Sequence, residues 1–228
     1  MLGTIVNTTT ILTGSIIGSR INKGIKEEHQ QVMFNAMGLA AFGLGINSVV
    51  QNMPNSAYPV LFIISLAVGS LVGELLDIDG RFKRLTDRFS GGNSLAQGLS
   101  TGILLFCVGT LSILGPIQSA LYGDNTYLFT NATLDFFSAT VLASTYGIGM
   151  CAAAIVLFCW QGAIYLCAGF LGPFLSQELL TEISVIGGFL IASSGMSILN
   201  VKQFKTMNML PCLLVPPVWC LIKGVIGL

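Results

Sequence analysis

The residues of this sequence that could do chemistry are a few polar side chains inside long apolar segments. Asp135 lies near the start of the apolar run 131–158, and Asp124 lies in the loop before it. A carboxylate inside hydrocarbon costs about 3 kcal/mol on insertion scales, so it is typical of a site for an ion, a proton or a polar solute. The alternative for Asp135 is a position at a helix N-terminus, where a carboxylate stabilises the helix dipole.

Further polar residues complete a candidate substrate-binding set with these two acids. We expect the ends of several helices to converge into a polar vestibule that ends at Asp135. The acids would then sense a cation or proton, and the amides and hydroxyls would contact a solute. Gln161 is expected at the inner end of its helix, where interhelical hydrogen bonding is the alternative role. The further residues are Asn7, Asn47, Ser112, Gln118 and Gln161.

Other kinds of chemistry have no motif in this sequence. It contains no HExxH zinc motif, no GxSxG nucleophile motif and no phosphate-binding loop. Its single histidine, His29, lies in a charged segment, and its six cysteines fall in apolar runs without a CxxC pair. We interpret the cysteines as packing residues. The sequence therefore predicts no enzyme, no catalytic residue, no metal site and no cofactor.

The composition indicates a membrane protein. Of the 228 residues, 53% are hydrophobic and 9% are charged, whereas soluble domains carry roughly 25% charged residues. The formal net charge is zero, which gives no field that would attract nucleic acid. The start of the sequence lacks the positive segment and cleavage site of a secretory signal, so the first helix is expected to be retained.

The apolar runs have the length that a bilayer requires of a helix, about 20 residues. They predict an all-α, polytopic membrane bundle of about eight transmembrane helices. A charged segment at 77–88 is typical of an interfacial amphipathic helix, and Pro211 predicts a kink in the last span. The weakest junction is the 158–160 turn, which lacks a polar break. The predicted spans are 2–19, 32–50, 57–76, 94–114, 131–158, 160–175, 181–199 and 207–227.

The basic residues predict the orientation of these spans. All but one of the Lys and Arg residues fall in alternate loops, which are cytoplasmic by the positive-inside rule. The chain is therefore expected in the bacterial inner membrane, multi-pass, with its N- and C-termini outside. We interpret Glu74, at the inner end of its span, as an interfacial carboxylate paired with Arg81 or Arg84. The residues on the basic side are Arg20, Lys23, Lys26, Arg81, Lys83, Arg84, Arg88, Lys202 and Lys205.

Pairs of glycines seven residues apart recur in three of the spans. They are Gly38 and Gly45, Gly102 and Gly109, and Gly188 and Gly195, and each pair precedes a small polar residue. We infer a single membrane domain over residues 1–228, with a three-helix unit at 1–77, a degenerate unit at 78–159 and an inverted three-helix unit at 160–228. Inverted repeats are typical of secondary transporters. The alternative is chance, because the chain has 27 glycines and glycine commonly serves helix packing.

Several blocks of sequence resemble a known bacterial family. The segment from Gly115 through Pro116 to Asp124, the Leu134-Asp135 pair, Gly147-Ile-Gly149 and Gln161-Gly162 resemble the YqgA/YdfK-like family, domain of unknown function 554 (DUF554). The resemblance covers nearly the whole chain. It implies a membrane transport protein whose substrate is not established.

Two functions are compatible with these observations. The first is a secondary transporter or facilitator that moves a small solute or ion across the inner membrane. The second is a non-transporting scaffold or subunit whose glycine-rich helices serve packing and oligomerisation. The expected partners are the lipid bilayer and a small solute or ion, with a homo-oligomer left open and no nucleic acid.

Overall fold

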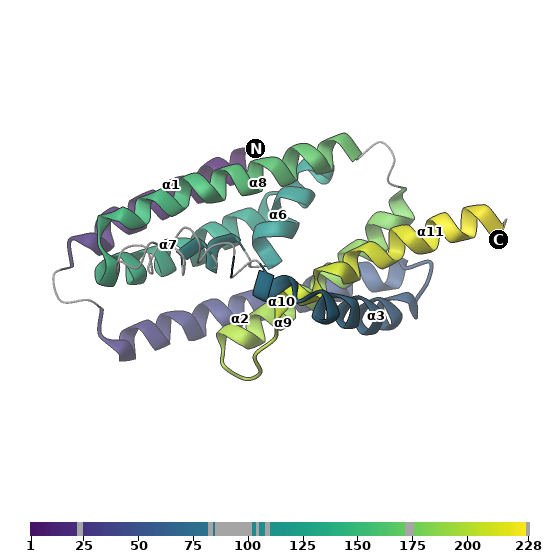
Figure 1. Ribbon diagram of the computed structural model, residues 1–228, viewed down its shortest axis with the longest axis horizontal. Helices are drawn as coiled ribbons and strands as arrows, with labels where there is room; N and C mark the ends of the chain where they lie inside the picture. The colour runs from purple at the N-terminus through teal and green to yellow at the C-terminus, as the bar shows by residue number, and fades with distance from the viewer. Residues whose placement is uncertain are drawn as a thin grey trace. The chain divides into compact units, whose positions relative to one another are not determined.

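The computed structural model describes residues 1–21, 25–81, 84, 102, 103, 105–107, 110–171 and 176–226. These residues are helical apart from short connections, and they contain no strand (Figure 1). The protein is therefore an all-α helical membrane bundle, as the composition predicted. Its helices form two compact units, one comprising residues 1–36 and 82–172 and the other residues 37–81 and 173–228. The three segments of the predicted repeat, 1–77, 78–159 and 160–228, do not coincide with these two units. The repeat stays a prediction.

The first unit is built on a pair of parallel helices. Helix α1 runs alongside α7 over most of its length: Gly3 faces Leu128, and Gly14 faces Phe136 and Thr140. Helices α6 and α8 pack against this pair, and α8 lies beside α1 in Figure 1. The elements of the unit are α1 (Leu2–Ser19), α6 (Thr110–Tyr122), α7 (Thr126–Tyr146), the 3-10 turn η2 (Ile148–Met150) and α8 (Cys151–Leu171), with the start of α2.

The second unit contains two helical hairpins. Helix α2 is followed by α3, and α9 is followed by a segment that is broken where Pro211 and the Pro216-Pro217 pair interrupt the backbone pattern. The kink expected at Pro211 is therefore present as a 3-10 segment. The elements are α2 (Glu27–Asn52), η1 (Met53–Asn55), α3 (Leu61–Leu76), α9 (Gln177–Ile198), α10 (Thr206–Met209), η4 (Leu210–Leu214) and α11 (Val215–Ile226).

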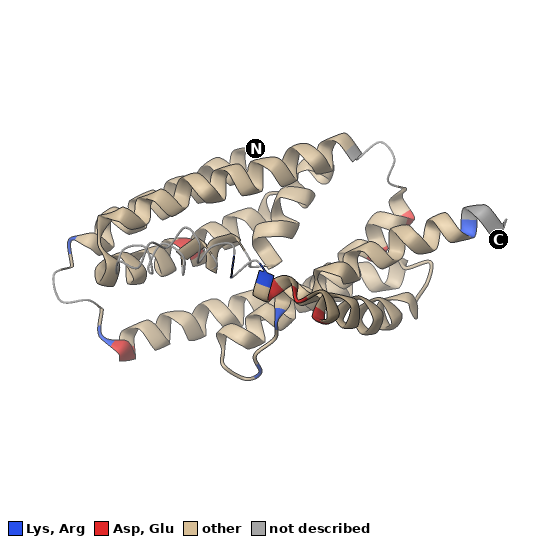
Figure 2. Cartoon of the chain, viewed as in Figure 1, with Lys and Arg blue, Asp and Glu red and all other residues tan. Residues whose placement is uncertain are grey.

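Five helical segments among the described residues are long and apolar enough to cross a membrane. They are 27–55, 61–81, 148–170, 177–198 and 206–223. Their outer faces carry large apolar side chains such as Leu75 and Phe170, each 77% exposed, as expected of surfaces that contact lipid rather than water. Figure 2 shows charged residues mainly near helix ends and in connections. Helices α1 and α7 are not among the five, and both carry several polar residues.

The break between the fifth and sixth predicted spans lies elsewhere than expected. Helix α7 ends at Tyr146, and Gly147 adopts a φ of 86°, which favours glycine because it has no Cβ. Helix α8 then continues without interruption through Trp160. The predicted turn at 158–160 is therefore wrong, and residues 131–171 belong to two helices that meet at the Gly147–Met150 turn. Apolar residues on both sides of that turn conceal it in a hydropathy profile.

The predicted loop at 115–130 is also mostly helical. Helix α6 includes Pro116 and reaches Tyr122, so that only Gly123–Asn125 connect it to α7. Proline is tolerated in a helix where neighbours satisfy the freed carbonyl group. Part of the 94–114 span, half of the amphipathic segment at 77–88 and Gly109 lie outside the described residues.

The glycine pairs of the second and seventh predicted spans face each other within the second unit. Gly38 contacts Gly195, and Gly45 contacts Gly188, so α2 and α9 cross in antiparallel directions. A Cβ on Gly45 would lie 2.6 Å from the Gly188 carbonyl oxygen, and a Cβ on Gly195 would lie 2.8 Å from that of Gly38. The absence of side chains therefore allows the two backbones to touch. The hydroxyl of Ser48 also donates to the Ser184 carbonyl at 3.2 Å.

One end of the second unit brings charged residues of two hairpins together. The Lys205 ammonium pairs with the Glu74 carboxylate, and Asn208 donates to the same carboxylate at 2.6 Å. The hydrogen bond to Glu74 raises the pKa of Lys205 above its ordinary value. The ion-pair partner of Glu74 is therefore Lys205, whereas the sequence predicted Arg81 or Arg84. The connection after α9 therefore lies beside the end of α3.

Candidate functional site

One face of α1 carries buried polar groups that the protein leaves without hydrogen bonds. The exposed and half-buried hydroxyls of α1 donate to carbonyls of their own helix, at 2.7 to 3.1 Å. In contrast, the hydroxyls of Thr4 and Ser15 and both polar atoms of the Asn7 side chain are fully buried and form no hydrogen bond. Such groups are rare in folded proteins and each costs about 1–3 kcal/mol. These unpaired groups on one face of α1 therefore indicate a position where a ligand or water binds.

Asp135 lies opposite this face, on α7. Helix α7 begins at Thr126, so Asp135 is more than two turns inside the helix and is 4% exposed. The helix-dipole effect is confined to the first turn, so the helix-terminus interpretation of this carboxylate is wrong. Asn131 donates to its Oδ2 atom at 2.8 Å. The Asn7 side chain lies near the same carboxylate but forms no hydrogen bond with it.

A second polar pair joins α8 to α6. Gln161 is fully buried, and its amide nitrogen donates to the Ser112 hydroxyl at 3.1 Å, while its amide oxygen accepts no hydrogen bond. Gln161 lies in the middle of α8 and not at a helix end, so its expected position at the inner face is wrong. An amide in the middle of a membrane helix needs a partner or water. Only one of its two polar atoms has a protein partner.

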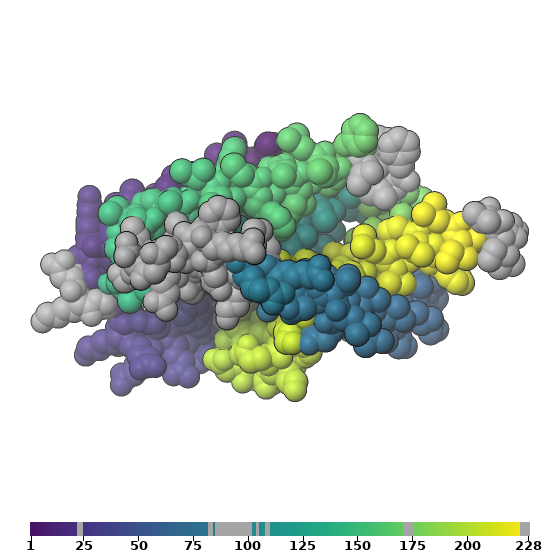
Figure 3. Space-filling model, in the orientation of Figure 1, coloured from purple at the N-terminus to yellow at the C-terminus, as the bar shows by residue number. Residues whose placement is uncertain are grey.

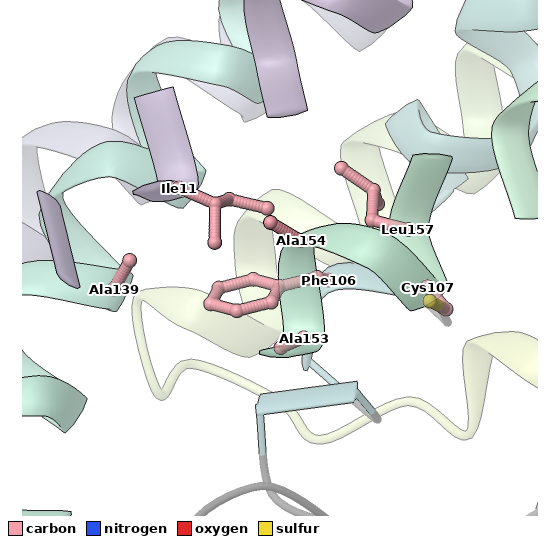
Figure 4. Packing of buried hydrophobic residues seen from close by; sticks show 7 residues of the cluster. All are labelled: Ile11, Phe106, Cys107, Ala139, Ala153, Ala154 and Leu157. Carbon is pink, nitrogen blue, oxygen red and sulfur yellow. The ribbon is translucent and has the colours of Figure 1, made fainter. Parts of the chain in front are cut away.

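Three of these polar residues lie one turn from members of an apolar cluster, on the same side of it. The cluster comprises Ile11, Phe106, Cys107, Ala139, Ala153, Ala154 and Leu157, and Figure 4 shows the Phe106 ring among the smaller side chains. Asn7 precedes Ile11 by one turn, Asp135 precedes Ala139 by one turn, and Gln161 follows Leu157 by one turn. Since α8 returns antiparallel to α7, the three shifts point in the same direction. We call Asn7, Ser112, Asn131, Asp135 and Gln161 the polar layer.

The remaining candidates lie outside the polar layer. Asp124 is exposed and accepts hydrogen bonds from the backbone nitrogen of Thr126, at 2.9 Å, and from its hydroxyl, at 2.7 Å. It therefore organises the start of α7. Gln118 is half-buried on α6, and Asn47 is exposed on α2 in the second unit. Among the described residues, no group of three or more His, Cys, Asp or Glu side chains could hold a metal ion.

A second buried carboxylate, Glu182, was not among the candidates. It is 1% exposed on α9 and accepts from the Ser56 hydroxyl at 2.7 Å and from the Tyr58 backbone nitrogen at 3.1 Å. Tyr58 in turn accepts a hydrogen bond from Lys223 at 2.7 Å and contacts the Trp219 ring. In Figure 3 this end of α11 (yellow) lies along α3 (blue). An acid inside the apolar run 181–199 was the signal that could have identified it.

Glu182 gives a prediction about stability. Replacing Glu182 with Ala removes the acceptor of the Ser56 hydroxyl and leaves the Tyr58 N–H with only its 3.2 Å hydrogen bond to the Ser56 hydroxyl. We expect a loss of about 1–3 kcal/mol in the free energy of unfolding. Differential scanning fluorimetry of the detergent-purified protein measures the change in Tm. Glu178→Ala, at an exposed position one turn earlier on the same helix, is the matched control. Equal Tm values for the two variants would contradict this role.

Comparisons with known proteins place the chain among membrane proteins of unassigned function. A family model described as "Protein of unknown function (DUF554)" matches residues 2–221. The chain is 54% identical over 228 residues to the uncharacterized membrane protein YdfK of Bacillus subtilis, covering 100% of this chain and 99% of that protein. It is 26% identical over 226 residues to the uncharacterized protein YqgA of Escherichia coli, covering 94% of each. No solved structure matches the chain.

Proposed function

This chain belongs to the DUF554 family of proteins of unknown function, and we propose that it is a secondary transporter or facilitator of a small solute or ion. The observation that carries the proposal is Asp135, a carboxylate buried well inside α7 and beside side chains that lack hydrogen bonds. A buried acid within a membrane protein is rarely retained for stability alone, because burial of its charge is costly. A role in binding a transported ion or solute would explain why the protein retains this buried acid.

The arrangement of helices supports an inverted repeat. The predicted repeat pairs the unit at 1–77 with the inverted unit at 160–228. Since α8 begins at Cys151, we extend the inverted unit to that residue, so that α1, α2 and α3 correspond to α8, α9 and the broken segment α10–α11. Helices α1 and α8 pack in the first unit, and the two hairpins pack in the second. The antiparallel crossing of Gly38 and Gly45 with Gly188 and Gly195 is what two inverted copies of one helix would form about a shared axis. Two such copies can expose a site alternately to the two sides of a membrane.

Membrane orientation gives a direct test of the inverted arrangement. In a cysteine-free background, Cys at Arg20, Lys202 or Lys205 is expected to react with an impermeant maleimide from the cytoplasmic side only. Cys at Lys223 is expected to react from the outside only. The readout is the mass shift of protein labelled in intact cells and in inside-out vesicles. Labelling of Lys202 and Lys223 from the same side would contradict both the topology and the inverted repeat.

Transport itself is tested with purified protein in liposomes. Ion movement is measured with entrapped pH- and Na⁺-sensitive dyes, and solute movement with pooled radiolabelled amino acids, sugars and organic cations. We expect protein-dependent flux of at least one ion or solute that saturates with concentration. Protein-free liposomes and heat-inactivated protein are the controls. Folded protein with no saturable flux under any gradient would favour the scaffold alternative, in which the glycine crossings serve packing alone.

A further inference from the structure

An apolar groove runs between the start of α3 and α11 in the second unit. Its volume is about 460 Å³, within the range of about 300–1,000 Å³ that ligand pockets occupy. We propose that this groove binds one acyl chain of an anionic phospholipid, whose phosphate contacts the Lys223 ammonium. The site shares no residue with the polar layer, so the proposal goes beyond transport and does not depend on it.

Apolar side chains form both walls of the groove. One wall comes from the α2–α3 connection and the start of α3, and it includes Val60 and Ile64. The other wall comes from α11 and includes Val215, Val218 and Ile222. Val60 and Ile64 are 62% and 51% exposed, so the groove opens onto the outer surface, which in a membrane protein faces lipid. Walls without hydrogen-bonding groups disfavour a polar ligand and favour hydrocarbon.

Polar groups gather at one end of the groove. Tyr58 and Trp219 line this end and pack edge to face, with their ring centroids 6.1 Å apart. The Lys223 ammonium donates to the Tyr58 hydroxyl at 2.7 Å and lies 5.3 Å from the centre of the Tyr58 ring. The membrane-length segment 206–223 ends at this lysine. Trp, Tyr and Lys at the end of a span are typical of the headgroup level of a bilayer.

The groove leads from this polar end toward the middle of the membrane. Val215 precedes Ile222 by seven residues, which is about 10 Å along a helix. On the opposite wall, α3 begins just after Tyr58 and reaches Ile64. The hydrocarbon of one leaflet is about 15 Å deep, so the groove accommodates about two-thirds of an acyl chain. A phospholipid with its phosphate on Lys223 therefore places that chain between α3 and α11.

Lys223 is positioned to contact a negatively charged headgroup. Its hydrogen bond to Tyr58 uses one N–H group, and a lysine ammonium carries further donors. Within the described part of the chain it forms no ion pair, and the acid whose charge reaches it is the exposed Glu178 on α9. Tyr58 is itself held by the buried Glu182, which accepts from its backbone nitrogen at 3.1 Å. An anionic headgroup is favoured over a zwitterionic one, because Lys223 repels the positive group of the latter.

Lipid binding is measured by native mass spectrometry of the detergent-purified full chain, titrated with phosphatidylglycerol or with phosphatidylcholine of identical acyl chains. We expect the first phosphatidylglycerol to bind about fivefold more tightly, which is the effect of one basic residue near a membrane surface. Equal affinities for the two lipids would overturn the proposal. Inorganic phosphate is the probe for a headgroup without a chain. Displacement of the bound lipid by phosphate would assign the site to a free anion and would also overturn the proposal.

Charge variants test the headgroup contact. Lys223→Gln removes the charge, and we expect its affinity for phosphatidylglycerol to fall about fivefold, to that for phosphatidylcholine. Lys202→Gln, the same substitution at an exposed residue after α9, is expected to bind like the wild type. Lys223→Arg keeps the charge and is expected to retain the preference, which keeps the test decisive if Lys223→Gln fails to fold. Indistinguishable affinities for Lys223→Gln and Lys202→Gln, or loss of the preference in folded Lys223→Arg, would overturn the proposal.

A groove variant tests where the acyl chain lies. Val218→Trp places a larger side chain in the groove and leaves the charge unchanged. We expect it to weaken the first binding of both lipids alike, because each would place the same hydrocarbon there. Wild-type affinity for phosphatidylglycerol in folded Val218→Trp would overturn the proposal. A dimer in the wild-type spectrum that Val218→Trp removes would assign the groove to a second copy of the chain instead of a lipid.

Discussion

Replacing Asp135 with Asn abolishes protein-dependent flux in liposomes while leaving the yield of folded protein unchanged. A carboxylate and a monovalent cation in contact at 4 Å attract each other by about 4 kcal/mol at an effective dielectric constant of 20. Loss of that attraction exceeds the 1.4 kcal/mol that corresponds to a tenfold change. We therefore expect flux to fall by more than about tenfold, to the level of protein-free liposomes. Folding is preserved because the Asn amide oxygen can still accept the hydrogen bond from Asn131.

Asp124→Asn is the matched control for this change. It is the same substitution eleven positions earlier in the chain, at an exposed residue that organises the start of α7. We expect its flux to remain within about twofold of the wild type, because the residue does not belong to the polar layer. Saturable flux of unchanged rate in Asp135→Asn would remove Asp135 from the transport site. Equal losses in both variants would indicate a general effect of acidic residues on orientation or insertion.

Replacing Gly45 with Ala destabilises the second unit. The added Cβ would lie 2.6 Å from the Gly188 carbonyl oxygen, and the backbone of Ala192 lies on the same side. Neither backbone can move without shifting a whole helix, and overpacking of this kind costs about 1–3 kcal/mol. We expect a Tm several degrees below that of the wild type and a reduced monodisperse peak in size-exclusion chromatography.

Gly43→Ala tests whether this effect depends on the crossing. Gly43 lies on α2 two residues earlier, and a Cβ there meets nothing within 4 Å. Ala also favours helical backbone over Gly. The expected Tm is equal to the wild type or slightly higher. If Gly43→Ala and Gly45→Ala lower the Tm alike, the destabilisation arises from α2 itself and the antiparallel crossing does not hold the unit together.

The spacing of residues along the chain could not predict where the candidate site residues lie within their helices. Hydropathy identified Asp135 as an acid in an apolar run. It placed the residue near a helix terminus because the polar residues of α6 and of the start of α7 predicted a loop there. It placed Gln161 at a helix end because the Gly147 turn is flanked by apolar residues on both sides. Both errors come from helix boundaries that local composition does not mark. Glu182 was missed because its acceptor role depends on Ser56 and Tyr58, more than a hundred residues away.

The sequence by itself determined the medium and the class of fold. Long apolar runs and a scarcity of charge leave helices in a membrane as the structure that satisfies every backbone hydrogen bond. It also located the glycines at which helices can approach closely. Only the tertiary structure decided which glycines meet, which basic residue pairs with Glu74, and which polar atoms of α1 lack hydrogen bonds. Burial and pairing depend on residues that are distant in the chain, whereas hydropathy is a property of each segment alone.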